Sequence, residues 1–97
     1  MIMREYDYYT LQGPNAYGQE TIADTPVGKI KMAVYIASQG IQDSILYEGV
    51  QYMGLTYDAE VRDTYVIDYE GEKMKVLYIT PQTARNAPKI VYMARMG

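Results

Sequence analysis

The segment TYVIDYEGEKMKVLYIT, Thr64 to Thr80, predicts a β-hairpin from its own residues. Two runs rich in β-branched and aromatic residues flank the tripeptide EGE, and Gly71 can adopt the positive φ that a tight turn requires. Pro81 follows directly and ends the second arm, because proline cannot donate a ladder hydrogen bond. The hairpin therefore predicts antiparallel sheet in this part of the chain.

The segment KIKMAVYIAS, Lys29 to Ser38, alternates between two faces and predicts a half-buried strand. One face carries Ile30, Met32, Val34 and Ile36, and the other carries Lys29, Lys31, Ala33 and Tyr35.

Three further strands are predicted on either side of these two segments: REYDYYTLQ (Arg4 to Gln12), VQYMGLTYD (Val50 to Asp58) and KIVYMARM (Lys89 to Met96). Gly54 inside the second of them indicates a bulge or a bend where a curved sheet closes. No amphipathic segment is long enough for a full helix. We therefore expect a single all-β domain over residues 1–97, a small five- to six-stranded β-barrel or sandwich with long loops and room for one short helical turn.

Two connections between these strands are unusually long. Gly13 to Gly28 collects glycine, proline, asparagine and threonine, as turns do. Ser38 to Gln51 differs, because it carries Ile41, Ile45, Leu46 and Tyr47, whereas a surface loop is ordinarily short or polar. One local explanation is a helical turn in which Ile41 and Ile45, at positions i and i+4, pack back on the domain.

Composition narrows the chemistry that we expect. The 97 residues include no cysteine, so neither disulfides nor a thiolate zinc site are indicated, and a reducing compartment is the expected setting. The first residues lack the pattern of a signal peptide, and no apolar run is long enough for a membrane span. Twelve tyrosines and seven methionines favour half-buried strand faces and adaptable contacts.

Catalytic and ligand-binding patterns are sparse. The chain has no histidine, which excludes Ser-His-Asp and Cys-His hydrolases. Zinc is nearly excluded as well, because neither Cys nor His ligands are present. Asp58, Glu60 and Asp63 form an acidic cluster, but Arg62 lies within it and the spacing of a calcium loop is missing, so a solvated turn is the preferred interpretation. Nine Lys and Arg against twelve Asp and Glu, a net charge of −3, disfavour a nucleic-acid groove. We expect a non-enzymatic protein without cofactor or metal.

The order of features resembles the head-closure (stopper, or head-completion) proteins of tailed bacteriophages, within the siphovirus head-tail joining family. The resemblance lies in YDYYTLQ (Tyr6 to Gln12), a turn-rich loop, KIKMAVYIASQ (Lys29 to Gln39), a long partly apolar loop and YMGLTYDAEVRDTYVIDYEGEKMKVLYI (Tyr52 to Ile79). In the last block Asp58 follows a strand, Val61 comes three residues later and the hairpin completes the pattern. Residues beyond Pro81 follow it only loosely.

The resemblance implies a structural virion protein that assembles in the host cytoplasm and then lies at the head-tail interface. It would form a homo-oligomeric ring, usually a dodecamer, below the portal and adaptor proteins, close the channel after DNA packaging and offer a docking platform to the tail terminator or tail-completion protein. Packaged double-stranded DNA would pass through without specific binding, and no membrane would be involved. Alternatives are a tail-completion or tail-terminator ring protein and, in a different class, a small nucleic-acid-binding β-barrel.

By position, the resemblance makes the loop after the second long strand the channel-gating loop, and Gly40 and Gly49 supply ends at which it could hinge. The connection Gly13 to Gly28 is either a disordered loop or a contact to a neighbouring ring. The segment Ala84 to Gly97 is either a closing edge strand or an arm added to a partner's sheet. The gating-loop residues are Gln39, Gly40, Ile41, Gln42, Asp43, Ser44, Ile45, Leu46, Tyr47, Glu48 and Gly49, and the contact-loop residues are Asn15, Tyr17, Gln19 and Glu20.

Overall fold

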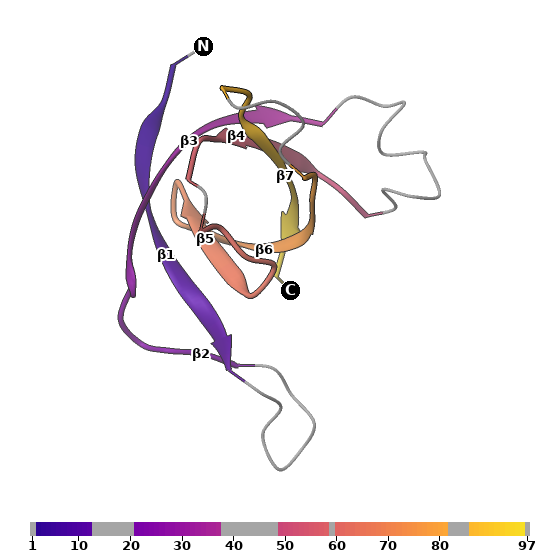
Figure 1. Ribbon diagram of the computed structural model, residues 1–97. Coiled ribbons are helices and arrows are strands. Elements are labelled where there is room, and N and C mark those ends of the chain that lie inside the picture. The colour runs from indigo at the N-terminus through magenta and orange to yellow at the C-terminus, as the bar shows by residue number, and fades with distance from the viewer. Residues whose placement is uncertain (1, 13–20, 38–48, 59, 82–85, 97) are drawn as a thin grey trace.

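A closed, antiparallel β-barrel forms the body of the protein in the computed structural model, which describes residues 2–12, 21–37, 49–58, 60–81 and 86–96 (Figure 1). Six strands close in the order β1-β3-β4-β7-β6-β5, and the pairing of β5 with β1 completes the circle. The predicted all-β fold is confirmed, as a barrel and not a sandwich. The strands are β1 (Arg4–Gln12), β2 (Thr21–Ile22), β3 (Gly28–Ile36), β4 (Tyr52–Thr56), β5 (Tyr65–Tyr69), β6 (Glu72–Ile79) and β7 (Lys89–Arg95).

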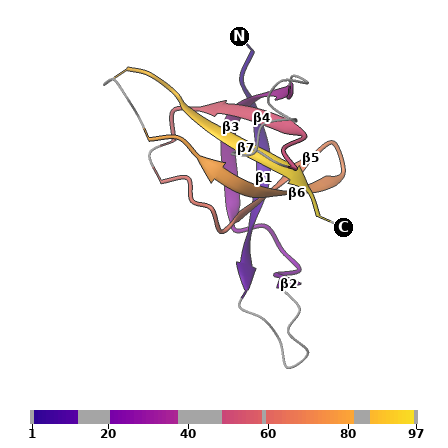
Figure 2. The same ribbon diagram turned by 90° about the vertical axis from the view of Figure 1, so that its right-hand side faces the viewer.

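The short strand β2 was not expected from the sequence, which indicated only a turn-rich connection there. It pairs with the end of β1 through Leu11 and Ile22, and Figure 2 shows this hairpin extending away from the barrel. Two residues are too few to show a period of two, so no sequence pattern could have revealed the strand.

The barrel has two ends that differ in what they carry. At the end that we call the loop end, β1 begins, β3 ends, β4 begins and β5 turns into β6. At the opposite end, the β2 end, β1 continues into its pairing with β2, while β5 and β7 begin. The long connection from β3 to β4 therefore starts and finishes at the loop end.

The interior is filled by side chains that alternate along the strands. Ile30 and Met32 of β3 face the core and are almost completely buried, as the alternation predicts. Ile36 belongs to the same face but is 78% exposed, because β1 pairs with β3 only as far as Met32 and does not cover the end of β3. The innermost residues of the other strands are Ile67, Met74, Val76, Val91 and Met93.

Gly54 lies in the middle of β4, in regular register with Val34 on one side and Val91 on the other. Of the two alternatives predicted for Gly54, a bulge or a bend, the bulge is therefore wrong, and the register shift lies instead on β6, between Val76 and Tyr78. The glycine is required by packing. A Cβ there would overlap Sδ of Met32 and lie 2.9 Å from its Cγ, so Met32 occupies the space that a side chain at position 54 would fill.

The turn between β5 and β6 has the geometry that its sequence predicts. Glu70 and Gly71 both have positive φ, 51° and 87°, as in a two-residue turn that matches the twist of its strands. Oδ1 of Asp68 accepts a hydrogen bond from the Gly71 N–H at 3.1 Å, and Oδ2 of the same carboxylate accepts one from Nζ of Lys73 at 2.9 Å. One aspartate therefore holds both the turn and the strand that follows it.

We predict that Gly54→Ala destabilises the fold by about 1–3 kcal/mol, because the added methyl group must displace the buried Met32 side chain. Denaturant unfolding measures the loss. In a Met32→Ala background the same change should cost much less, since the overlapping atoms are gone. Equal costs in both backgrounds would show that Met32 is not the reason for the glycine.

Candidate functional site

The candidate gating loop connects β3 to β4 at the loop end of the barrel. Gly49 is the one residue of the proposed gate that the structure describes. The contact-loop residues Asn15, Tyr17, Gln19 and Glu20 lie outside the described residues. The same holds for Gln39, Gly40, Ile41, Gln42, Asp43, Ser44, Ile45, Leu46, Tyr47 and Glu48 of the gating loop, and for the helical turn proposed there.

The two flanks of this loop are buried against the outer wall of the barrel. Ala37 and Val50 are 3% and 2% exposed and pack with Tyr92 of β7 in a cluster separate from the main core. Met53 and Ile90, from β4 and β7, pack against the same cluster. We call these five residues the anchor cluster. It gives the barrel an apolar patch on its outside that is covered by the flanks of the loop.

Gln51 holds the base of the loop with three hydrogen bonds. Its backbone C=O accepts a hydrogen bond from the Ala37 N–H at 3.0 Å, and its N–H donates to the Met93 carbonyl at 2.9 Å. Its side-chain Oε1 accepts a third bond, from the Arg95 N–H at 2.8 Å. The end of β3, the start of β4 and the end of β7 are therefore tied together where the loop departs.

Gly49 joins this fixed base to the loop. Its φ is +85°, a conformation that strongly favours glycine, and no described atom would touch a Cβ placed there. The glycine is thus required by the backbone and not by crowding. The proposed hinge at Gly49 is compatible with this geometry and stays a prediction.

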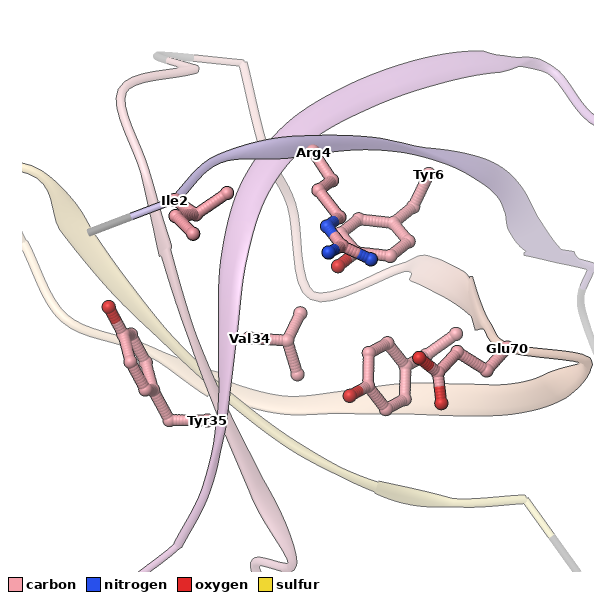
Figure 3. A pocket seen from close by; sticks show the side chains of 7 residues that line it. Ile2, Arg4, Tyr6, Val34, Tyr35 and Glu70 are labelled. Carbon is pink, nitrogen blue, oxygen red and sulfur yellow. The ribbon is translucent and has the colours of Figure 1, made fainter.

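A groove of about 500 Å³, which we call the loop-end groove, opens beside these elements (Figure 3). It exists because β1 pairs with β5 only from Tyr8 to Thr10, so the start of β1 faces no strand on that side. The rings of Tyr6 and Tyr69 lie 5.7 Å apart in its wall, and Figure 3 shows Arg4 and Glu70 beside them. The groove is lined by Ile2, Arg4, Tyr6, Val34, Tyr35, Tyr69 and Glu70.

The shifted ionisable groups do not suit acid-base chemistry near neutral pH. Burial, and secondarily Tyr69, raises the pKa of Tyr6. Hydrogen bonding to Asp68 raises the pKa of Lys73, and hydrogen bonding to Tyr52 raises that of Arg95. All three values move further from neutrality, so Tyr6 stays protonated and both cations stay charged at pH 7.

The acidic cluster after β4 is organised as a turn. Oδ1 of Asp58 accepts a hydrogen bond from the Glu60 N–H at 2.9 Å, and the Asp58 N–H donates to Oγ1 of Thr56 at 3.1 Å. Within the described ranges, no three acidic, histidine or cysteine side chains are grouped so that they could hold a metal ion. The same ranges contain no helix long and apolar enough to cross a membrane.

At the β2 end, Tyr8 and Tyr65 close the interior with stacked rings 4.3 Å apart. Burial, together with hydrogen bonding to Tyr8, raises the pKa of Tyr65 to about 12 from an ordinary value of 10.0. The folded protein therefore favours the protonated form of the Tyr65 hydroxyl.

With this geometry described, comparison with known proteins adds no assignment: no family model matches the chain, and no curated protein is significantly similar to it.

The loop-end groove was missed by the sequence reasoning. Its walls come from the start of β1, the end of β3 and the β5–β6 turn, which meet only when the barrel closes. The anchor cluster was also missed, although the alternation of KIVYMARM could have indicated it. Ile90 and Tyr92 lie on one face of this strand and Val91 and Met93 on the other, so both faces are apolar. Two apolar faces indicate that the outer face of the strand is covered.

We predict that Gln51→Met speeds hydrogen exchange of the Arg95 amide about fivefold. The substitution removes the side-chain acceptor of this amide and with it roughly 1 kcal/mol of local protection, whereas the backbone hydrogen bonds of Gln51 remain. Exchange followed by NMR gives the rate. Gln12→Met, at an exposed site on β1, is the matched control. Unchanged exchange at Arg95 would mean that the side-chain bond does not hold the base of the loop.

We predict a loss of stability between pH 10 and pH 12 that depends on Tyr65. In this range the unfolded chain loses the Tyr65 proton while the folded chain keeps it, so its contribution is complete below pH 10 and declines as the pH rises toward 12. Tyr65→Phe should flatten this decline in denaturant unfolding at successive pH values. Tyr57→Phe, at a 54% exposed position, should leave it unchanged, and an equally steep decline in Tyr65→Phe would refute the assignment.

Proposed function

We propose that this protein is a structural, non-enzymatic component of a phage head-tail connector, which forms a ring below the portal and adaptor and closes the channel after DNA packaging. The observation that carries the proposal is the fixed base of the loop between β3 and β4. Its flanks are buried in the anchor cluster and joined by the Ala37–Gln51 hydrogen bond, while the sequence between them includes Ile41, Ile45 and Leu46.

A gate needs a firm support and a segment that can seal the opening. The barrel and Gln51 supply the support, since three strands are tied at the point of departure. Apolar side chains from symmetry copies of the loop would exclude water where they meet on a ring axis, which is the sealing contact that we propose. The small closed barrel also agrees with the fold that the resemblance implies.

Surface charge supports passage of DNA without retention. Three cations of the described surface are paired with carboxylates: Lys29 with Asp7, Lys73 with Asp68 and Arg95 with Glu72. Paired cations neutralise fewer phosphates, and the net charge of −3 repels a polyanion. This weighs against the alternative of a small nucleic-acid-binding barrel, for which filter binding at low salt should detect no complex.

The substitutions Ile45→Asp and Leu46→Asp test the gate. We predict that the isolated variants fold, as judged by circular dichroism, but that heads assembled with them lose packaged DNA, because a charge opposes apolar contact between loops. Protection of head DNA from added nuclease is the measurement. Val27→Asp, at a 56% exposed position preceding β3, is the control that should retain DNA. Heads that keep their DNA with Ile45→Asp and Leu46→Asp would exclude the gating role.

A tail-completion or tail-terminator ring protein is the alternative within the connector. It would lie one ring lower, so mass spectrometry of tailless, DNA-filled heads separates the two. A head-closure protein stays with these heads, whereas a tail component is missing from them.

A further inference from the structure

The start of β1 is a strand edge that faces a groove. β1 pairs with β3 from Arg4 to Tyr8, whereas its pairing with β5 covers only Tyr8 to Thr10. The loop-end groove lies between the start of β1 and the β5–β6 turn. Figure 3 shows Arg4 and Tyr6 projecting from β1 into this space. One side of β1 therefore has no paired strand here among the described residues.

The backbone of this edge offers hydrogen bonds that β5 does not take up. On the β3 side, the Tyr8 carbonyl accepts a bond from the Val27 N–H at 2.8 Å. On the β5 side, the Leu11 N–H donates to the Thr64 carbonyl at 2.7 Å. Backbone groups alternate between the two sides of a strand, so the N–H and C=O of Glu5 point to the β5 side, where the described ranges place no strand in register with them. An extended segment laid along the edge can bond to both groups.

Charge gives a physical reason why the β1–β5 ladder ends where it does. One further step of the register would place Asp7 opposite Asp68. Like charges directly opposite each other destabilise a sheet. Each carboxylate is instead paired across the other ladder of its strand, Asp7 with Lys29 of β3 and Asp68 with Lys73 of β6. Electrostatic repulsion therefore opposes closure of the seam toward the loop end.

The outer face of the seam is acidic on both adjoining strands. Alternation puts Glu5 and Asp7 on the outer face of β1, and Asp68 on the outer face of β5. The lysines that accompany them on β3 and β6 lie one strand farther from the seam, about 5 Å away. Glu5 forms no ion pair with any described residue, although Lys31 lies opposite it in the register. A strand added at the seam therefore meets carboxylates first on this face.

The inner face of the same edge is aromatic and apolar. The rings of Tyr6 and Tyr69 lie 5.7 Å apart, and those of Tyr52 and Tyr69 lie 5.5 Å apart. Val34 lines the groove beside them. The two charged residues of the groove lining, on β1 and in the β5–β6 turn, have opposite signs and offset each other. Walls of this kind accept apolar side chains.

From this edge we infer that a partner protein adds to β1 an extended segment in which basic and apolar residues alternate. The segment runs antiparallel to β1, where β5 has diverged, and bonds to the backbone of Glu5. Its apolar side chains enter the loop-end groove, and its lysine or arginine side chains lie beside Glu5 and Asp7. The same edge of a second copy does not fit, because it would set these carboxylates of two chains side by side. The inference does not rest on the proposed function.

Amide exchange followed by NMR tests the added strand, with a capped hexapeptide of alternating lysine and valine as the probe. The peptide should slow exchange of the Glu5 amide about tenfold or more, whereas the Tyr6 amide, which faces β3, should change little. A peptide with glutamate in place of lysine should leave both unchanged. A second groove of about 590 Å³ lies at the β2 end and includes Leu77. Protection at Leu77 without protection at Glu5 would overturn the inference.

Methylation of the peptide separates backbone pairing from charge attraction. Residues opposite each other on paired strands share a face, so the lysine N–H groups face β1 and the valine N–H groups face away. N-methylation of the lysine nitrogens should weaken binding about tenfold or more, because it removes the donors to β1. N-methylation of the valine nitrogens is the matched control and should weaken it far less. Equal effects of the two modifications would exclude an added strand.

Substitution in the protein tests the charge. Glu5→Lys should weaken binding of the lysine–valine peptide about fivefold, whereas Asp24→Lys, at an exposed position outside the groove, should not change it. An undiminished affinity of Glu5→Lys would overturn the inference. Protection of the Glu5 amide that rises with protein concentration, without peptide, would identify a second copy as the occupant and also overturn it. DNA-tight Ile45→Asp heads would reject the gate and leave this edge unaffected.

Discussion

The ladder between β1 and β5 is the constraint on which the rest of this structure depends. Only three residue pairs form it, from Tyr8–Ile67 to Thr10–Tyr65, yet it converts an open sheet into a barrel. The stacked rings of Tyr8 and Tyr65 lie at this seam. Because the ladder is short, β1 diverges from β5 toward the loop end, and the space between them becomes the loop-end groove. Beyond the ladder in the other direction, β1 extends to pair with β2.

Closure also sets the demands on the interior. A six-stranded barrel has room for few side chains, and Met32 fills its centre only because Gly54 across the β3–β4 ladder has none. With the inside filled, the apolar residues on the outer face of β7 need another cover. The flanks of the β3–β4 loop provide it at the anchor cluster, so the packing that stabilises the barrel also fixes the base of the proposed gate.

The two ends of the barrel differ in what they carry. The loop end carries the fixed base of the proposed gate and the loop-end groove, and a second groove lies at the β2 end. A modest core is tolerable in the proposed ring, because neighbouring copies bury further surface and add stability through mass action. Tyrosine suits these surfaces, since its ring packs against apolar neighbours while its hydroxyl stays hydrated.

Apart from the two-residue strand β2, the sequence by itself determined which segments become strands and which faces of them are apolar. The bounds of β1 and the positive φ of Gly71 follow from local rules, because side-chain alternation and turn geometry involve residues that are neighbours in the chain. It also indicated that the β3–β4 loop is unusual, through Ile41, Ile45 and Leu46. Only the tertiary structure decided that Gly54 makes room for Met32, that Ile36 is exposed and that the flanks of the loop cover Tyr92. Each of these depends on which distant strands meet when the barrel closes, and contacts between distant residues leave no periodic signal along the chain.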